Sequence, residues 1–257
     1  MNSSTRILLN KVPEITITFW IIKILSTTVG ETCADYLADN VGLGQSLTST
    51  IMGGLLLLAL IKQVSSKQYT PWIYWLNVVL VSIVGTQITD ILTDKIGVSL
   101  YVSTAIFSVL LMSVFAIWFS IEKTLSIHEV TTTRRELFYW LAILCTFALG
   151  TAAGDLATEA LSLGFNRGVL IFGGLIAMTF AAWKMGGNPV LTFWLAYILT
   201  RPFGAALGDL LTQAKEYGGL GVGAMWTSII FLSLISILVS IAQLNCRVTT
   251  AYPRSSN

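Results

Sequence analysis

The sequence predicts an all-α membrane protein with eight transmembrane helices, arranged as four parallel two-helix repeats in a pseudo-symmetric bundle. Of its 257 residues, 54% are hydrophobic and only 11% are charged, with a mean hydropathy of +0.77, whereas a soluble domain is about a quarter charged. Apolar runs of spanning length recur along the chain, and one residue pattern occurs four times. This composition argues against a soluble enzyme, a disordered segment and a nucleic-acid-binding protein, so no nucleic-acid partner is expected.

Eight apolar runs are each close to the ~20 residues that a helix needs to cross the ~30 Å hydrocarbon layer. In chain order they cover residues 15–36, 44–62, 71–92, 99–121, 137–158, 165–183, 189–211 and 222–243. An even number of crossings places both ends of the chain on one side. The expected organisation is a tail at 1–14, repeats at 15–66, 67–121, 137–186 and 187–245, a loop at 122–136 between the second and third repeats, and a tail at 246–257.

Lysine and arginine residues predict the orientation of the chain. Ten of the fifteen lie in the two tails or in the loops after the second, fourth and sixth spans, and three lie in the other loops. The positive-inside rule therefore places both tails and the 122–136 loop in the cytoplasm. The remaining two, Lys23 and Arg201, lie within spans. Lys23 is near the cytoplasmic start of its span, so its side chain is expected to snorkel to the interface.

A fourfold internal repeat organises the spans. Four segments align without gaps, and each begins with an aromatic residue and a Trp, followed by Gly ten residues and Asp fifteen residues after the Trp. The matching positions are Trp20, Trp75, Trp140 and Trp194, then Gly30, Gly85, Gly150 and Gly204, then Asp35, Asp90, Asp155 and Asp209. Each interval is long enough for one marked helix and one plainer helix. Two-helix units keep their orientation, so the repeats are predicted to be parallel.

The four-copy pattern resembles a bacterial integral-membrane family described only as tandem repeats of unknown function and usually labelled an uncharacterised membrane-anchored protein. That family has four repeats of two transmembrane helices, each with a characteristic Trp. The resemblance covers about residues 15–245. It departs at Gln213, where the other copies have the acids Asp39, Asp94 and Glu159. The resemblance implies the repeat fold and a location in the bacterial inner membrane, and it implies no activity.

The repeated Gly and Trp residues have structural explanations. Each Gly begins a small-xxx-small pair, which allows helix backbones to approach closely in lipid. The pattern indicates that the marked helices contact one another, or their repeat partners, around a common axis. The Trp near the start of each marked helix is expected at the cytoplasmic interface, where an amphipathic indole is favoured.

The repeated carboxylates point to function. On a straight helix each Asp lies about 22 Å beyond its Trp, in the outer half of the membrane, and the residues four before and four after it share its face. This stripe holds eight of the thirteen acids: Glu31, Asp35, Asp39, Asp90, Asp94, Asp155, Glu159 and Asp209. Ionisable residues within a span usually face the protein interior or a water-filled cavity. Ion binding or proton relay is therefore expected at these residues.

Oxygen ligands without His or Cys suit Mg²⁺, Mn²⁺, Ca²⁺ or protons, so the metal ligands would be Asp35, Asp90, Asp155 and Asp209. The competing interpretation is structural: each Asp could bond a neighbouring helix, and the second acid of each repeat could be a solvated interfacial residue. Arg201 needs a partner within its span. Glu31 and the aspartates are the candidates, in an internal ion pair that either fixes the packing or acts as a gate.

The sequence contains no nucleophile motif, phosphate-binding loop, dinucleotide fingerprint or HExxH. Its three scattered cysteines, Cys33, Cys145 and Cys246, and its single histidine, His128, form no spaced metal set. Neither an enzyme nor a resident cofactor is expected.

Three functional hypotheses remain. The first is a transporter or channel for a small cation, either a divalent metal such as Mn²⁺ or Mg²⁺, or protons. The protein would be in contact with the lipid bilayer, and a homo-oligomer is one option. The second is a non-transporting membrane scaffold or sensor, whose acids are structural and whose 122–136 loop meets a partner. The third is a carrier of a cationic organic solute that uses Trp or Tyr side chains.

Overall fold

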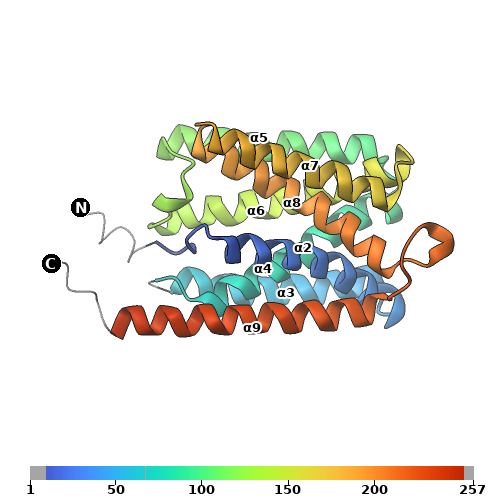
Figure 1. Cartoon of the computed structure of the whole chain (residues 1–257), viewed down its shortest axis with the longest axis horizontal. Coiled ribbons are helices and arrows are strands. Elements are labelled where there is room, and N and C mark those ends of the chain that lie inside the picture. Colours follow the sequence, from blue (N-terminus) through green and yellow to red (C-terminus); the bar gives the residue numbers. More distant parts are fainter. Residues whose placement is uncertain (1–9, 67, 252–257) are drawn as a thin grey trace.

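The computed structural model describes residues 10–66 and 68–251, without the side chains of Asp39 and residues 247–251. Within this part the chain is helical and contains no strand. Eight long helices are present, and each overlaps one predicted span. They are α2 (Ile17–Asp35), α3 (Gly44–Ser65), α4 (Pro71–Asp90), α5 (Leu100–Glu122), α6 (Thr133–Asp155), α7 (Gly164–Lys184), α8 (Pro189–Thr212) and α9 (Ala224–Ala251). In Figure 1, α2 begins and α9 ends at the same end of the molecule.

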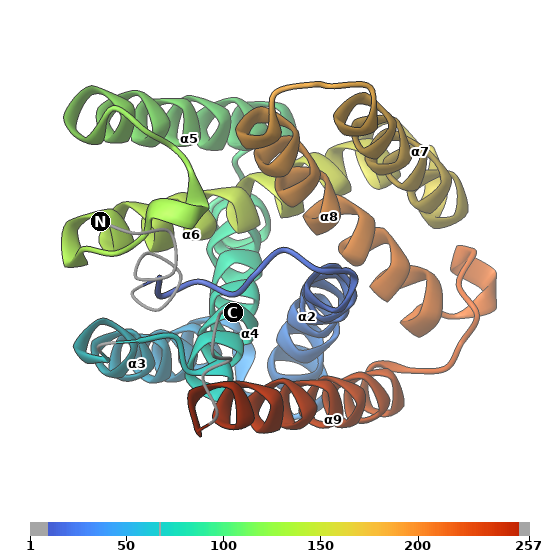
Figure 2. The ribbon, with the colours of Figure 1, turned by 60° about the vertical axis from the view of Figure 1, so that its left-hand side comes forward.

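The four marked helices form a closed inner ring. α2 packs against α4, α4 against α6, α6 against α8, and α8 back against α2. Each outer helix packs on the inner helix of the following repeat: α3 on α4, α5 on α6, α7 on α8, and α9 on α2. The contact of α9 with α2 joins the last repeat to the first. The four repeats therefore make one pseudo-fourfold bundle, with the outer helices around the ring (Figure 2).

Local sequence signals set the helix starts. Thr16, Ser99, Thr132 and Asn188 each accept a hydrogen bond from a backbone N–H of the first helical turn, which satisfies a donor that the helix itself leaves unpaired. α4 and α8 begin with a proline, which lacks the N–H that would have no partner at this position. Gly44 and Gly164 start α3 and α7 with a positive φ, which glycine adopts without a steric cost.

Seven of the long helices, α3 to α9, are long and apolar enough to cross a membrane. The exception is α2, whose apolar character is lowered by Lys23 and Glu31, both of which are buried. The outer helices are mostly exposed and present large apolar side chains, including Leu58, Val109 and Met178. An apolar outer surface around a polar interior is the arrangement expected of a helical membrane bundle.

The acidic ends of the inner helices differ between repeats. In three repeats a π-helical turn follows the Asp directly: η1 (Tyr36–Asn40), η2 (Ile91–Lys95) and η4 (Leu156–Ala160). In the fourth repeat α8 continues to Thr212 and leads into the 3₁₀ turn η5 (Lys215–Tyr217) and a glycine-rich loop. π-turns occur frequently at functional sites. Their recurrence beside three of the repeated aspartates identifies this end of the ring as a candidate functional region.

The segment expected as a 122–136 loop is shorter and well packed. α5 ends at Glu122, a 3₁₀ turn η3 spans Ile127–Glu129, and α6 begins at Thr133. Glu122 accepts hydrogen bonds from Arg134 and Arg135. Ile127 and Val130 are buried in the main apolar core. Most of this connection therefore packs against the bundle.

Candidate acidic site in the inner ring

A pocket of about 440 Å³ lies at the end of the inner ring where the marked helices finish. The repeated Asp of each inner helix lines it, so all four repeats contribute to one space. Its acidic lining consists of Glu31, Asp35, Asp90, Asp94, Asp155, Glu159 and Asp209, with Gln213 in the fourth repeat. The remaining predicted residue, Asp39, lies outside the side chains that the structure describes. Among the described residues, the four repeated aspartates thus share one cavity.

Three of these acids lie close enough together to share one cation. Glu31, Asp35 and Asp209 can each offer one carboxylate oxygen, and these atoms lie within 4.8 Å of one another. They come from α2 and α8, which are neighbours where the ring closes. Carboxylate oxygens at this spacing suit a hard divalent cation. Of the four metal ligands predicted from the sequence, Asp35 and Asp209 belong to this group, whereas Asp90 and Asp155 line the same pocket outside it.

Arg201 lies across the ring beneath the pocket. Its Nη2 donates to Glu31 Oε2 at 2.6 Å, to Thr151 Oγ1 at 2.7 Å and to Thr86 Oγ1, and its Nη1 donates to the carbonyl of Thr27 at 3.2 Å. Arg201 belongs to α8, and these partners belong to α2, α4 and α6. A side chain that reaches all three other inner helices must occupy the centre of the ring. Since Glu31 also lines the pocket, the fully buried guanidinium marks the inner end of the pocket.

Lys23 is buried in the ring, and the expectation that it snorkels to the interface is wrong. Its side chain is 1% exposed, and its Nζ lies 4.1 Å from the ring centroid of Phe147 and 4.2 Å from that of Tyr197. The Nζ has no hydrogen-bond partner among the described residues. Lys23 precedes Thr27 by one helical turn on the same face, and that face is turned toward the other inner helices. Cation–π contacts replace the solvent that an interfacial lysine would have.

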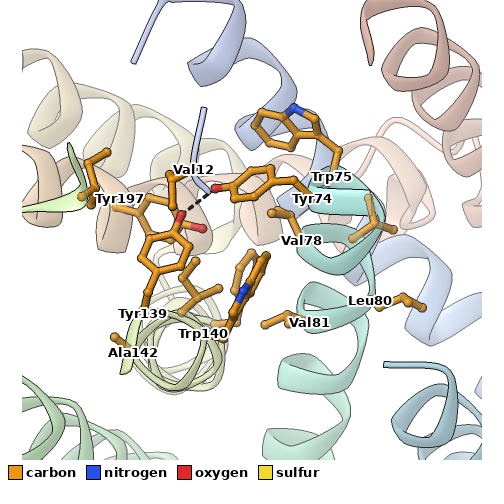
Figure 3. Close-up of a cluster of buried hydrophobic side chains, with 14 of the residues drawn as sticks. Val12, Tyr74, Trp75, Val78, Leu80, Val81, Tyr139, Trp140, Ala142 and Tyr197 are labelled. Atoms are coloured by element: carbon orange, nitrogen blue, oxygen red, sulfur yellow. Dashed lines mark hydrogen bonds between the residues drawn. The ribbon is translucent and has the colours of Figure 1, made fainter. Parts of the chain in front are cut away.

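An aromatic layer fills the ring at the end opposite the pocket. In each repeat the aromatic residue before the Trp contacts the Trp of the next repeat, at centroid distances of 5.4 to 6.2 Å. The four contacts between repeats are Phe19–Trp75, Tyr74–Trp140, Tyr139–Trp194 and Phe193–Trp20. The hydroxyls of Tyr74 and Tyr139 share a hydrogen bond of 2.5 Å (Figure 3).

The tryptophans therefore contribute to the core of the ring. Trp75, Trp140 and Trp194 are buried, and Trp20 is half-buried. The expected interfacial position is wrong for the three buried residues, because the preceding repeat supplies an aromatic partner for each indole. The indole N–H of Trp194 donates to the carbonyl of Leu125 at 3.0 Å, which ties the ring to the 123–132 connection.

The repeated glycines make the contacts between inner helices possible. A Cβ added to any of them would come within 2.6 Å of an atom in the next inner helix. The four contacts are Gly30 with Ser82, Gly85 with Phe147, Gly150 with Arg201 and Gly204 with Thr27. Each contacted residue lies seven positions after the Trp of its own repeat. The small-residue stripe thus sets the diameter of the ring at the level of Arg201.

A family model described as Repeat of Unknown Function (DUF347) matches four stretches of the chain, residues 18–69, 73–124, 138–186 and 192–245. Each stretch covers one inner helix and the outer helix that follows it. No curated protein and no solved structure matches the chain.

Proposed function

Because the chain belongs to the Repeat of Unknown Function (DUF347) family, whose description assigns no activity, we propose a function from the geometry of the ring. The protein is a transporter or channel for a small cation, which is either a divalent metal such as Mn²⁺ or Mg²⁺ or a proton. It spans the bacterial inner membrane with eight helices and has both termini in the cytoplasm. The acidic pocket then faces the opposite side of the membrane.

The observation that carries this proposal is the convergence of Asp35, Asp90, Asp155 and Asp209 on one pocket. Carboxylates gathered in the interior of a membrane bundle repel one another unless protons or cations compensate their charge. Such residues are costly in a membrane protein and usually mark ion or proton pathways. A purely structural role would be served by separate bonds at each helix pair and would not need a common cavity.

The chemistry of the site supports a hard cation. Glu31, Asp35 and Asp209 provide three converging carboxylates, and the polar side chains that line the pocket are carboxylates, amides and hydroxyls, with no His or Cys. Oxygen-only sites of this kind suit Mg²⁺, Mn²⁺ and Ca²⁺. Asp90, Asp155, Asp94 and Glu159 add negative charge around the same space, which attracts cations toward it.

Arg201 couples the acidic pocket to the centre of the inner ring, through which the cation path would continue. Glu31 binds the guanidinium in this structure, so a cation that takes Glu31 as a ligand competes with Arg201 for the same carboxylate. Beneath Arg201 the ring is filled by Lys23, Phe147 and Tyr197 and then by the aromatic layer. In the proposed mechanism this arrangement is a state with access to the pocket from the acidic end only. Passage requires these central side chains to rearrange, as in alternating access.

The path is formed within one chain, because the fourth repeat closes the ring onto the first. No second copy is needed to complete it, although a homo-oligomer is compatible with it. The proposed activity involves no catalysed reaction, resident cofactor or nucleic acid. Lipid is the partner of the exposed apolar outer helices.

Ion flux in proteoliposomes tests the proposal. Wild-type protein is reconstituted and assayed for uptake of Mn²⁺, of Mg²⁺ and of protons. An Asp90→Asn/Asp155→Asn variant should lose flux of the transported ion, while Glu216→Gln, which removes an exposed acid outside the pocket, should retain it. Both variants must keep the monodisperse elution and thermal unfolding of the wild type. Absence of flux for all three ions in the wild type, or unchanged flux in the double variant, would contradict the proposal.

A further inference from the structure

The segment before α2 covers the end of the ring opposite the pocket. Residues 10–13 run without helical structure, and Lys11, Val12 and Pro13 are buried. Figure 2 shows this blue segment crossing the end of the inner ring before it enters α2. In Figure 3, Val12 lies beside the hydrogen-bonded pair Tyr74 and Tyr139. Among the described residues, an extended stretch of chain, and not a helix, therefore covers the aromatic layer here.

A buried ion pair holds this segment in place. Lys11 Nζ donates to Glu136 Oε2 at 2.7 Å and to the carbonyl of Val64 at 2.9 Å. The second oxygen of Glu136 accepts from Gln63 Nε2 at 2.9 Å, and Glu136 and Gln63 are each 1% exposed. The backbone N–H of Lys11 donates to the carbonyl of Val130 at 3.1 Å. One lysine thus connects the segment to α3, to α6 and to the 123–132 connection.

We propose that residues 10–13 are a strap that closes the inner mouth of the cation path, and that the Lys11–Glu136 ion pair is its latch. This inference rests on the proposed function, since it assigns the inner gate of that path. A buried ion pair contributes little net stability compared with an apolar pair, yet loss of one partner leaves an uncompensated buried charge. The intact Lys11–Glu136 ion pair can therefore hold the strap in the closed position at little net cost in stability. Loss of either partner should release the strap from the bundle.

Helix α2 connects the strap to the acidic site at the other end of the ring. The strap leads into the cap residue Thr16 and then into α2, and α2 carries Lys23, Glu31 and Asp35. A cation that draws Glu31 away from Arg201 acts on the same helix that the strap precedes. Movement of α2 along or about its axis would pull on the strap at the other end. The fold therefore contains a mechanical link between the outer site and the inner mouth.

Thiol labelling tests the strap without any measurement of transport. In a background with Cys33, Cys145 and Cys246 replaced by serine, the reporter is Val78→Cys, which lies in the inner ring near the strap and is fully buried. Purified protein in detergent is treated with a small water-soluble maleimide. The latch variants are Lys11→Gln and Glu136→Gln, and the rescue variant is Lys11→Glu/Glu136→Lys. Lys62→Gln removes an exposed lysine at the same end of the bundle as a matched control.

Release of the latch should speed labelling of the Val78→Cys thiol at least about tenfold, which is less than the full effect that loss of one partner of a buried ion pair can have. The charge-swapped variant and Lys62→Gln should label as slowly as the latched protein. A second reporter, Ala152→Cys, is fully buried in α6 beyond Arg201 and should stay slow throughout. Unchanged labelling at Val78→Cys in both latch variants, or equal acceleration at both reporters, would overturn the strap. A transport failure with the predicted labelling pattern would instead overturn only the proposed function.

Discussion

Arg201 Nη2 and Glu31 Oε2 lie 2.6 Å apart in the buried centre of the ring, so the inner helix of the fourth repeat is bonded to that of the first. The same carboxylate lines the acidic pocket and belongs to its three-acid group. This ion pair therefore has two roles: it joins the two ends of the repeat array, and it separates the pocket from the interior that contains Lys23. Its properties determine several of the measurable consequences below.

Loss of either partner of this ion pair should destabilise the protein. Glu31→Gln leaves the guanidinium without a counter-charge, and Arg201→Met leaves the carboxylate unpaired, so each should lower the free energy of unfolding by about 3–5 kcal/mol. The double variant Glu31→Gln/Arg201→Met should lose clearly less than the sum of the two. Denaturant unfolding in detergent measures the cycle, and additive losses would show that the two groups do not interact.

Removal of Arg201 should strengthen cation binding at the pocket. Arg201→Met removes a positive charge that competes for Glu31, so the Kd for Mn²⁺ should fall at least about tenfold, because ligand charge tunes such sites over orders of magnitude. Asp209→Asn should raise that Kd by a similar factor. Isothermal titration calorimetry measures both, with Lys184→Met as a control that removes an exposed charge on α7. Equal Kd values for wild type and Arg201→Met would contradict direct competition.

The glycines that face neighbouring inner helices should not tolerate a methyl group. Gly30→Ala places its Cβ against Ser82, and such overpacking should cost about 1–3 kcal/mol. Gly53 lies within α3 with no atom within 4 Å of an added Cβ. Gly53→Ala should therefore be neutral or stabilise by up to about 1 kcal/mol through helix propensity. Thermal unfolding of the two variants gives the comparison, and equal stability of both would show that the ring is looser than described.

The contributions of the Tyr74 and Tyr139 hydroxyls to the stability of the protein should be coupled, because the two groups share one hydrogen bond. Tyr139→Phe leaves the fully buried Tyr74 hydroxyl without its partner, which should cost about 1–3 kcal/mol. Tyr74→Phe/Tyr139→Phe removes both hydroxyls and keeps the aromatic layer, so it should recover most of that loss. The unfolding midpoints of the three variants provide the measurement. If the double variant were the least stable of the three, the hydroxyls would have to make other bonds.

The sequence was sufficient for the elements and for the repeat, because spanning length and a fixed residue pattern are local properties. The eight helices overlap the eight predicted spans, and the family match covers the four repeats. Glu31 was one of the partners that the sequence offered for Arg201, and the ion pair between them confirms it. The hydroxyl partners Thr86 and Thr151 lie four residues before the repeated Asp of their own helices, as Glu31 does. Helical periodicity places each of these residues on the same face as the repeated Asp of its own helix.

The sequence was not sufficient for features that depend on neighbours. Hydropathy could not show that Lys23 turns inward, because an amphipathic side chain near the end of a span has the same pattern whether it faces lipid or a neighbouring ring. The burial of Trp75, Trp140 and Trp194 depends on aromatic partners supplied by another repeat. The packing of α9 on α2 and the Lys11–Glu136 bond join residues far apart in the chain, and one sequence carries no signal for either.

The location of a bound cation tests the central claim most directly. Crystals of the wild-type protein grown with Mn²⁺ should show one anomalous difference peak in the acidic pocket, coordinated by oxygens of Glu31, Asp35 and Asp209. Crystals of Asp209→Asn under the same conditions should show a weaker peak or none. A wild-type pocket without an anomalous peak, at Mn²⁺ concentrations that support flux, would contradict the assignment of this pocket as the cation site.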